Sequence, residues 1–231
     1  MWLGDLNELS QRDLMMLAAH NIPSHHDIGS EFYEGQIEAV FTERSQEQRI
    51  LHAQSKFAAE LAEKHASLRF LKMDKEAVEL LANLKRPVYF TEEEFGAAVE
   101  AMTKLFIERI DAEQLRANIQ PLLSALEAKA AKGFRELKIL QLWLDKRLHV
   151  GDPGAMMMPL FVLYDLRVAF KHLLPDERKE ELRLSSISRL GLKPDATLEG
   201  IYVRLTASLE HSFDDMVRAS TSSSQLSGSN S

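Results

Sequence analysis

The most restrictive feature of the sequence is the segment 159–174, PLFVLYDLRVAFKHLL, which is apolar on almost every side of a helix yet contains charged residues. A helix that is apolar all round is normally buried between neighbouring helices. Charged side chains cost free energy in such a place unless they are paired or take part in function. The segment is therefore predicted to form the core of the fold, and it is the first place to look for chemistry.

The local sequence predicts where this helix starts and ends. Pro159 suits the first turn of a helix, where its missing N–H would have no partner. Pro175 disfavours helical conformation at the residue before it, so we expect the helix to end near Leu174. The charged residues then lie within a helix of about four turns.

The rest of the chain also has helical rather than strand periodicity, and the run 88–90 is too short to form a convincing strand. Thr91 and Glu94 have the spacing of a capping box that opens a helix, and Asp195 is a candidate cap for the last helix. We therefore predict an all-α protein. Its predicted helices are 11–20, 31–65 with an interruption near 42–46, 75–84, 92–110, 122–132, 134–148, 159–174, 177–190 and 196–217.

Three regions follow from this pattern. Residues 1–88 are predicted to form an additional N-terminal helical region, and residues 89–219 a multi-helix bundle that contains the central helix. Residues 220–231 are rich in serine and have too little apolar surface to bury, so we expect them to be disordered.

Composition excludes several classes of protein. The chain has 231 residues, a formal net charge of −7 and no cysteine. The lack of cysteine excludes a disulfide framework, thiolate metal sites and a catalytic thiol, and it fits a reducing compartment, so we expect a cytoplasmic protein. No stretch approaches the roughly 18 uncharged apolar residues of a membrane span, and we expect no membrane association. The negative charge argues against a large non-specific nucleic-acid footprint.

A group of histidines near the N-terminus is the best candidate for a metal site. His20, His25, His26 and Asp27 lie close together in a stretch with the composition of a turn, and they could bind zinc or another transition metal. Exposed histidines in a turn are the simpler interpretation, because no fourth ligand with suitable geometry is evident. We therefore predict no metal and no other cofactor.

Arg167 and His172 have the spacing Arg-x4-His within the central helix. A histidine titrates near neutral pH and can move the proton of an RNA 2′-hydroxyl or of the leaving 5′-oxygen. An arginine offers a permanent planar fork for the phosphate charge that grows in the transition state. The pair suits metal-independent RNA cleavage. A second match, Arg204-x6-His211, lies opposite the apolar stripe of the last helix and is most simply a solvated face.

Helix geometry constrains how Arg167 and His172 could act together. Five residues turn through about 500°, so the two side chains leave an ideal helix about 140° apart and cannot converge directly on one phosphate. A two-fold interface would present the helix to its own copy and bring an arginine and a histidine together. We therefore predict a homodimer formed through residues 159–174, with RNA as a second partner.

The sequence LYDLRVAFKHLL, in a late helix of an all-α chain, resembles the signature helix of the HEPN superfamily (higher eukaryotes and prokaryotes nucleotide-binding domains). The resemblance covers roughly residues 90–218. It implies a dimeric helical bundle with a composite endoribonuclease site that leaves a 2′,3′-cyclic phosphate, and by family analogy a role in defence or as a toxin. It assigns phosphate binding to Arg167 and acid–base chemistry or substrate orientation to His172. We add Lys171 and Asp165 as substrate-binding residues.

Two alternatives stay open. Val168 stands where active HEPN members usually carry a polar residue, so the chain is an endoribonuclease or an inactive relative. In a different class, the protein is a non-enzymatic helical interaction or oligomerisation module, in which His172 caps carbonyl groups at the helix end. Arg167 is then a structural cation, whose candidate partners are Asp165 of a second copy, Glu94, Glu100 and Glu108.

Overall fold

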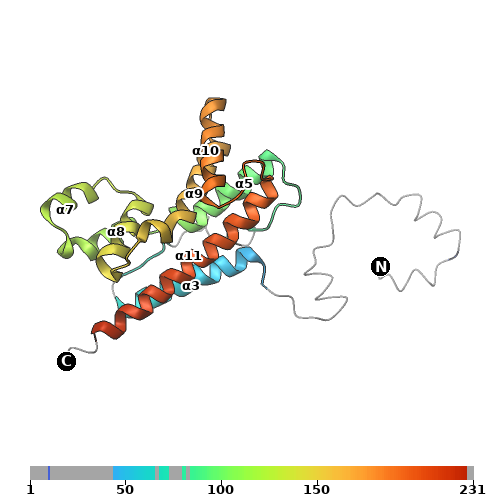
Figure 1. The fold of residues 1–231 in the computed structure, drawn as a ribbon. Coiled ribbons are helices and arrows are strands. Elements are labelled where there is room, and N and C mark those ends of the chain that lie inside the picture. The colour runs from blue at the N-terminus through green and yellow to red at the C-terminus, as the bar shows by residue number, and fades with distance from the viewer. Residues whose placement is uncertain (1–9, 11–43, 66–67, 73–79, 82–83, 228–231) are drawn as a thin grey trace. The chain divides into compact units, whose positions relative to one another are not determined.

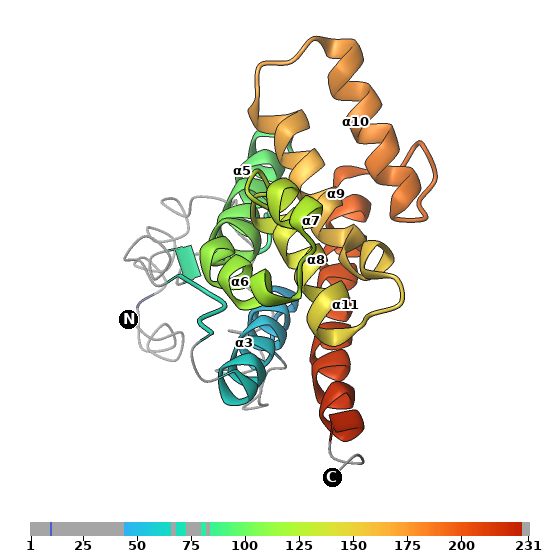
Figure 2. The ribbon, with the colours of Figure 1, turned by 90° about the vertical axis from the view of Figure 1, so that its left-hand side faces the viewer.

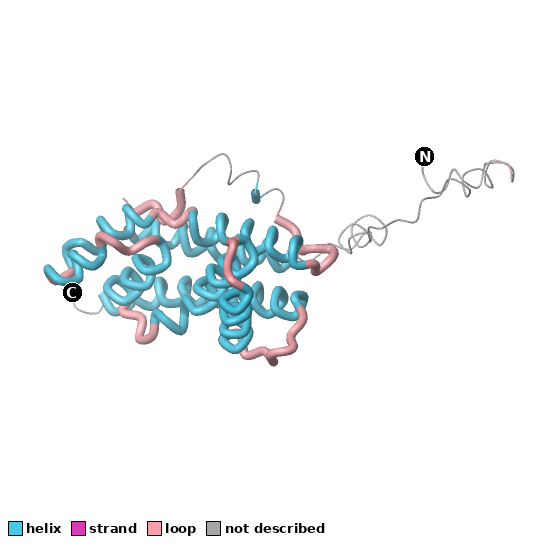
Figure 3. The backbone as a smooth tube through the Cα atoms, turned by 90° about the horizontal axis from the view of Figure 1, so that it is seen from above, coloured by secondary structure: helices cyan, strands magenta, loops and turns pink. Residues whose placement is uncertain are grey.

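The computed structural model describes residue 10 and residues 44–65, 68–72, 80–81 and 84–227. Helices joined by loops make up most of these residues (Figures 1 and 3). They contain no β-strand, and Leu71 and Ile110 form only an isolated antiparallel bridge. The predicted all-α class is confirmed.

The elements of the described residues follow one another along the chain. In order they are α3 (Gln46–Lys64), α5 (Glu92–Thr103), the π-helical turn η3 (Lys104–Glu108), α6 (Ala112–Ile119), the 3₁₀ turn η4 (Gln120–Leu122), α7 (Ala125–Ala131), α8 (Glu136–Leu148), α9 (Pro153–Lys171), α10 (Asp176–Arg189) and α11 (Leu198–Ser227).

The described residues from 44 onward belong to one compact unit. Within it, α3 and α11 lie side by side (Figures 1 and 2). The boundary that we predicted after residue 88 therefore does not separate two units, because α3 packs on the last helix of the bundle. The helix predicted at 11–20, the first part of that at 31–65 and most of that at 75–84 lie outside the described residues.

Capping residues fix where α3 and α5 begin. The Ser45 hydroxyl accepts a hydrogen bond from the Gln48 N–H at 3.3 Å, and the Gln48 side chain accepts one from the Ser45 N–H at 3.2 Å. This capping box falls at the predicted interruption of the long N-terminal helix. Thr91 caps α5 as predicted, with 3.2 Å to the Glu94 N–H. The Glu94 carboxylate instead accepts from the Tyr89 N–H, so the second half of that predicted box is not formed.

Between α5 and α9 the helices differ from the prediction at two points, because α6 was not predicted and the next helix starts later. The helix predicted from residue 122 starts later, at Ala125, because Ser124 and Glu127 form a capping box after the turn η4. The helix predicted at 134–148 corresponds to α8, and its leucines at helical spacing are buried: Leu137, Leu140, Leu144 and Leu148.

The central helix α9 begins earlier than predicted. Asp152 is its N-cap and accepts a hydrogen bond from the Ala155 N–H at 2.9 Å, and Pro153 occupies the first turn. Pro159 lies inside the helix and is buried, so its assignment to the first turn is wrong. A proline suits a helix start only where no better cap lies upstream, and the Asp152–Pro153 pair supplies one.

The end of α9 also differs from the prediction. The helix stops at Lys171, and His172 has extended backbone angles of φ −103° and ψ 148°. Leu173, which belongs to the predicted helix 159–174, is fully exposed. The chain needs these extended residues to turn into α10, which extends beyond its neighbours (Figures 1 and 2).

The last two helices show one confirmed end and two differences. The end of the helix predicted at 177–190 is confirmed to within one residue, and Gly191 follows it with φ +70°. The Thr197 hydroxyl accepts from the Gly200 N–H at 3.1 Å and opens α11, so Asp195 is not its cap. The helix then runs to Ser227, eight residues into the segment predicted to be disordered. Part of that segment packs on α3, where the Lys64 ammonium group donates to the Ser220 carbonyl at 2.7 Å.

Candidate functional site

The central helix α9 has a buried side and a solvent side. It packs against α5, α8, α10 and α11, and the residues that it buries are Met157, Pro159, Leu160, Val162, Leu163, Leu166 and Ala169. Tyr164 is 44% exposed and Lys171 is also exposed. The expectation that this helix is buried all round is therefore wrong, and its charged residues have access to solvent.

A close crossing brings α5 against α9. A Cβ atom at Gly96 would lie only 3.3 Å from Cδ of Lys171 and 3.4 Å from Cβ of Phe170. The rings of Phe95 and Phe170 meet edge to face at 4.9 Å between their centroids. The missing side chain at position 96 thus allows the two helices to approach, and it places the charged residues of α5 beside those of α9.

Arg167 is paired within its own chain. Its Nη1 atom lies 3.0 Å from Oε1 of Glu108, one of the carboxylates that the sequence suggested as a partner. The Arg167 side chain is 23% exposed and the Glu108 side chain is 44% exposed. The Nε atom of Arg167 is buried and has no hydrogen-bond partner. The guanidinium group is therefore held by one carboxylate while part of its hydrogen-bonding capacity is unused.

The π-helical turn η3 explains how Glu108 reaches α9. In a regular α-helix, eight residues would place the side chains of Glu100 and Glu108 about 80° apart. The turn absorbs one extra residue, which reduces this angle to about 20°. Both carboxylates therefore face α9, whose Arg167 and Lys171 lie four residues apart and also share a side. Such turns are frequent at functional sites.

Lys171 is paired with the second of these carboxylates. Its ammonium group lies 3.1 Å from Oε2 of Glu100. This hydrogen bond lowers the pKa of Glu100 against a smaller opposing effect of burial, and the positive charges of Lys171, Lys104 and Arg167 lower it further. Three basic side chains therefore act on one carboxylate at the α5–α9 crossing.

Asp165 and His172 do not join this cluster. The Asp165 carboxylate lies 2.6 Å from Nη1 of Arg189, so it ties α9 to α10. His172 is exposed beyond the end of the helix, and its backbone N–H donates to the Val168 carbonyl at 3.3 Å. Within the described part of the chain, no hydrogen bond or ion pair joins His172 to Arg167. The four predicted site residues are thus divided among three positions: the α5–α9 crossing, the α10 contact and the helix end.

Sequence reasoning missed the way the cluster is assembled. Glu100 and Glu108 were weighed only as single alternative partners of Arg167, and Lys104 was not considered. The signal was present as charges at positions 100, 104 and 108 on one predicted helix. These charges share a side only because of the π-helical turn, which no residue pattern predicts.

The second Arg–His match is solvated, as expected. Arg204 and His211 are both exposed. Arg204 donates from Nε to the Leu190 carbonyl at 3.1 Å, and the His211 ring contacts the Ala207 carbonyl at 2.8 Å. These two residues therefore serve as matched controls for Arg167 and His172.

The metal prediction can be assessed for only part of the chain. His20, His25, His26 and Asp27 lie outside the described residues. In the part that the structure describes, no group of three or more histidine, aspartate or glutamate side chains is arranged to hold a metal ion.

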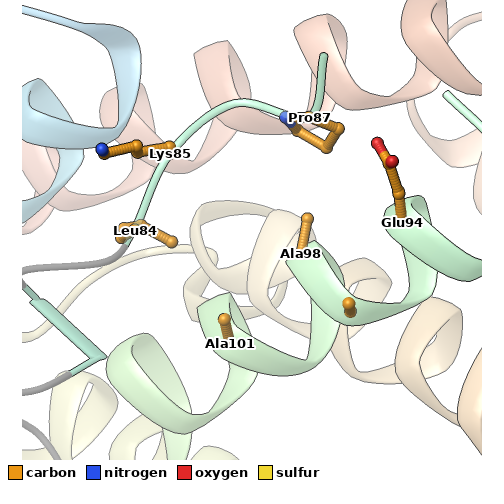
Figure 4. A pocket seen from close by; sticks show the side chains of 7 residues that line it. Leu84, Lys85, Pro87, Glu94, Ala98 and Ala101 are labelled. Carbon is orange, nitrogen blue, oxygen red and sulfur yellow. The ribbon is translucent and has the colours of Figure 1, made fainter. Parts of the chain in front are cut away.

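A cleft of about 280 Å³ lies between the segment 84–87 and α5 (Figure 4). Its lining is formed by Leu84, Lys85, Pro87, Glu94, Ala97, Ala98 and Ala101. None of the four predicted site residues belongs to this lining. The Glu94 carboxylate in this lining is already engaged, because it accepts a hydrogen bond from the Tyr89 N–H.

Among the described helices, α9 alone is long and apolar enough to cross a membrane by length and composition. The core helix of a soluble protein passes the same test, and in this chain α9 packs against four other helices. Its charged residues Asp165, Arg167 and Lys171 are paired with side chains of those neighbours or of η3. The length and composition of α9 are therefore only weak evidence for a membrane span.

Comparisons with protein-family models, with curated proteins and with solved structures found no match to this chain.

Proposed function

We propose that the chain is a HEPN-like helical protein that cleaves RNA without metal, in a composite site that two copies form across the exposed side of α9. Arg167 binds the phosphate and His172 moves the proton. The observation that carries this proposal is the position of Arg167 on the solvent side of the central helix, held by one half-exposed carboxylate. A cytoplasmic location and a role in defence or as a toxin belong to the same proposal.

The proposed reaction needs no group beyond those two side chains and the RNA. His172 accepts the proton of the 2′-hydroxyl, the 2′-oxygen bonds to phosphorus, and the bond from phosphorus to the 5′-oxygen breaks. The protonated His172 gives this proton to the leaving 5′-oxygen, and a 2′,3′-cyclic phosphate remains. Arg167 stabilises the negative charge that grows on the phosphate oxygens. His172 lies beyond the end of α9, and within the described residues no hydrogen bond or ion pair joins it to Arg167, so the arginine of one copy acts with the histidine of the other.

A second candidate is a non-enzymatic helical interaction module. The ion pairs of Asp165, Arg167 and Lys171 favour it, because each ties α9 to a different segment of the same chain. Val168, the apolar residue after the arginine, favours an inactive relative, because active HEPN members usually carry a polar residue there. In this class the charges hold the fold, and the exposed side of α9 contacts a protein.

The experiment is an RNA cleavage assay on the full chain with single-stranded RNA in excess EDTA. The parent protein is expected to cut and to leave 2′,3′-cyclic phosphate ends. Arg167→Ala and His172→Ala should each lower the rate by at least about 100-fold. The controls Arg204→Ala and His211→Ala remove the same residue types from a solvated face and should cut like the parent.

Sedimentation and circular dichroism complete the test. The two site variants should remain folded dimers, since their effect is on chemistry. If the parent does not cut RNA, and if Arg167→Ala dissociates or unfolds it, the enzyme proposal is wrong and the interaction module is favoured.

A further inference from the structure

We propose that Glu108 is a resident competitor for the anion at Arg167. Its carboxylate occupies the place of a phosphate group, and Arg167 must exchange Glu108 for phosphate before it can bind RNA. The anion site is built on Arg167, with Lys171 four residues further along α9. RNA as its ligand rests on the proposed function, whereas the competition at the site does not.

The first step is the chemistry of the guanidinium group. Carboxylates and phosphates accept hydrogen bonds from the same planar fork of N–H groups. Arg167 uses Nη1 for Glu108 at 3.0 Å, while its buried Nε–H has no acceptor. A buried donor without a partner costs free energy, so the Glu108-bound arrangement is not the best that this guanidinium can reach. A ligand with more acceptor oxygens can improve on it.

The second step is exposure. The side chains of Glu108 and Arg167 are 44% and 23% exposed, so water reaches the pair. Ion pairs with this exposure contribute little to stability and exchange readily. Glu108 can therefore swing into solvent at low cost, and the arginine remains anchored through the apolar part of its side chain on α9.

The third step is the local balance of charge. Lys104, Arg167 and Lys171 all lie near enough to act on Glu100. With Glu100 and Glu108 in place, Arg167 and Lys171 each face one carboxylate, and Lys104 adds its positive charge near Glu100. If the Glu108 carboxylate leaves, Glu100 stays paired with Lys171 at 3.1 Å, and the site keeps an excess of positive charge that favours a phosphate.

The test compares Glu108→Gln with the parent in the full chain, using inorganic phosphate as the probe. Nuclear magnetic resonance of arginine Nε–H groups follows binding, and Arg167→Lys identifies the signal of Arg167. Glu108→Gln should bind phosphate about five- to tenfold more tightly, because glutamine keeps the size but loses the competing charge. Glu108→Ala, a second variant, should show the same gain.

Two controls isolate the effect. Glu92→Gln removes an α5 carboxylate that pairs with Lys179 of α10, changes the net charge equally, and should leave phosphate affinity within about twofold of the parent. The gain of Glu108→Gln should vanish in the double variant Glu108→Gln/Arg167→Ala. A role for Glu108 in structure alone would lower thermal stability and leave phosphate affinity unchanged.

Cleavage of single-stranded RNA by the same proteins separates this inference from the proposed function. If the parent cuts RNA through Arg167 but Glu108→Gln gains no phosphate affinity, the competition is wrong and the nuclease stands. If Glu108→Gln gains phosphate affinity and no protein cuts RNA, Glu108 does compete at an anion site and the nuclease fails. Absence of both effects overturns both proposals.

Discussion

Two pairs of neighbouring helical segments in the same unit are each joined by a carboxylate. The two carboxylates differ in their exposure to solvent. Between α3 and α11, Glu47 is 3% exposed and accepts a hydrogen bond from the Tyr202 hydroxyl at 2.7 Å. Between η3 and α9, the side chain of Glu108 is 44% exposed and pairs with Arg167. A sealed carboxylate needs a permanent partner, whereas one in contact with water can change partners.

We therefore expect the α3–α11 side of the unit to contribute most to stability, and the charged residues of the α5–α9 crossing to be able to change partners. Phe57 of α3 lies in the sealed region, fully buried against the rings of Phe70 and Trp143 at 5.0 and 6.5 Å. The crossing also has apolar rings, the buried Phe95 and the half-buried Phe170, but its charged residues lie at the solvent edge. Mutations on the two sides should therefore differ in size and in kind.

The largest effect is expected for Phe57→Ala. It should lower the free energy of unfolding by about 3–5 kcal/mol, because it removes a fully buried ring and leaves a cavity. Urea unfolding followed by circular dichroism measures the change. Leu173→Ala, at a fully exposed leucine, should stay within about 0.5 kcal/mol of the parent. A loss below about 1 kcal/mol for Phe57→Ala would place the stable core elsewhere.

Tyr202→Phe is expected to cost less, about 1–3 kcal/mol, because it leaves the buried Glu47 carboxylate without its donor. Tyr164→Phe removes a hydroxyl from a residue that is 44% exposed and should cost under about 0.5 kcal/mol. Equal effects of the two variants would contradict the contrast between sealed and exposed polar groups.

Tyr202 should also make stability depend on alkaline pH. Burial, the negative charge of Glu47 and the hydrogen bond to it raise the pKa of Tyr202 well above its ordinary value of 10.0. The folded state therefore keeps a proton that the unfolded state loses. The resulting stability is fully present below pH 10 and is lost as the pH rises above it, by at most about 1.4 kcal/mol per unit. Tyr202→Phe should remove this part of the slope, and Tyr164→Phe should keep it.

The sequence predicts local elements better than it predicts which elements meet. The helix α8, the cap at Thr91 and the end of α10 depend on residues close together in the chain, and each was predicted correctly or to within two residues. The start of α9 was misplaced because Pro153 and Pro159 both suit a first turn, and only the Asp152 cap decides between them. Local rules are reliable where a single signal is present.

The candidate site needed information that lies outside local sequence. Arg167 had several carboxylates to choose from, and the choice of Glu108 depends on the π-helical turn and on the close approach of α5 to α9 at Gly96. The packing of α3 on α11 joins segments more than 130 residues apart, which periodicity does not encode. The residue types were predictable, whereas their grouping was not.

A smaller effect on stability is expected at the crossing. Glu108→Gln should change the free energy of unfolding by no more than about 1 kcal/mol, because the pair with Arg167 lies partly in water. Urea unfolding at low and at high salt measures this, and added salt should reduce the difference further. A loss as large as that of Tyr202→Phe would mean that Glu108 is a fixed structural partner, and the contrast between the two helix pairs would fail.

The smallest effect should appear only in a titration. The hydrogen bond from Lys171 lowers the pKa of Glu100, so the folded state holds this carboxylate charged to a lower pH than the unfolded state does. The small stability that follows is present above the ordinary pKa of 4.5 and is lost as the pH falls through the lowered value. Lys171→Met should raise the pKa of Glu100 toward 4.5, as carbon-detected magnetic resonance of the side-chain carboxyl would show. Glu92 lies on α5, as Glu100 does, and its partner is Lys179 of α10. Lys179→Met should leave the titration of Glu100 unchanged. If Lys171→Met does not move the pKa of Glu100, the charges at this crossing act too weakly on one another to form an anion site.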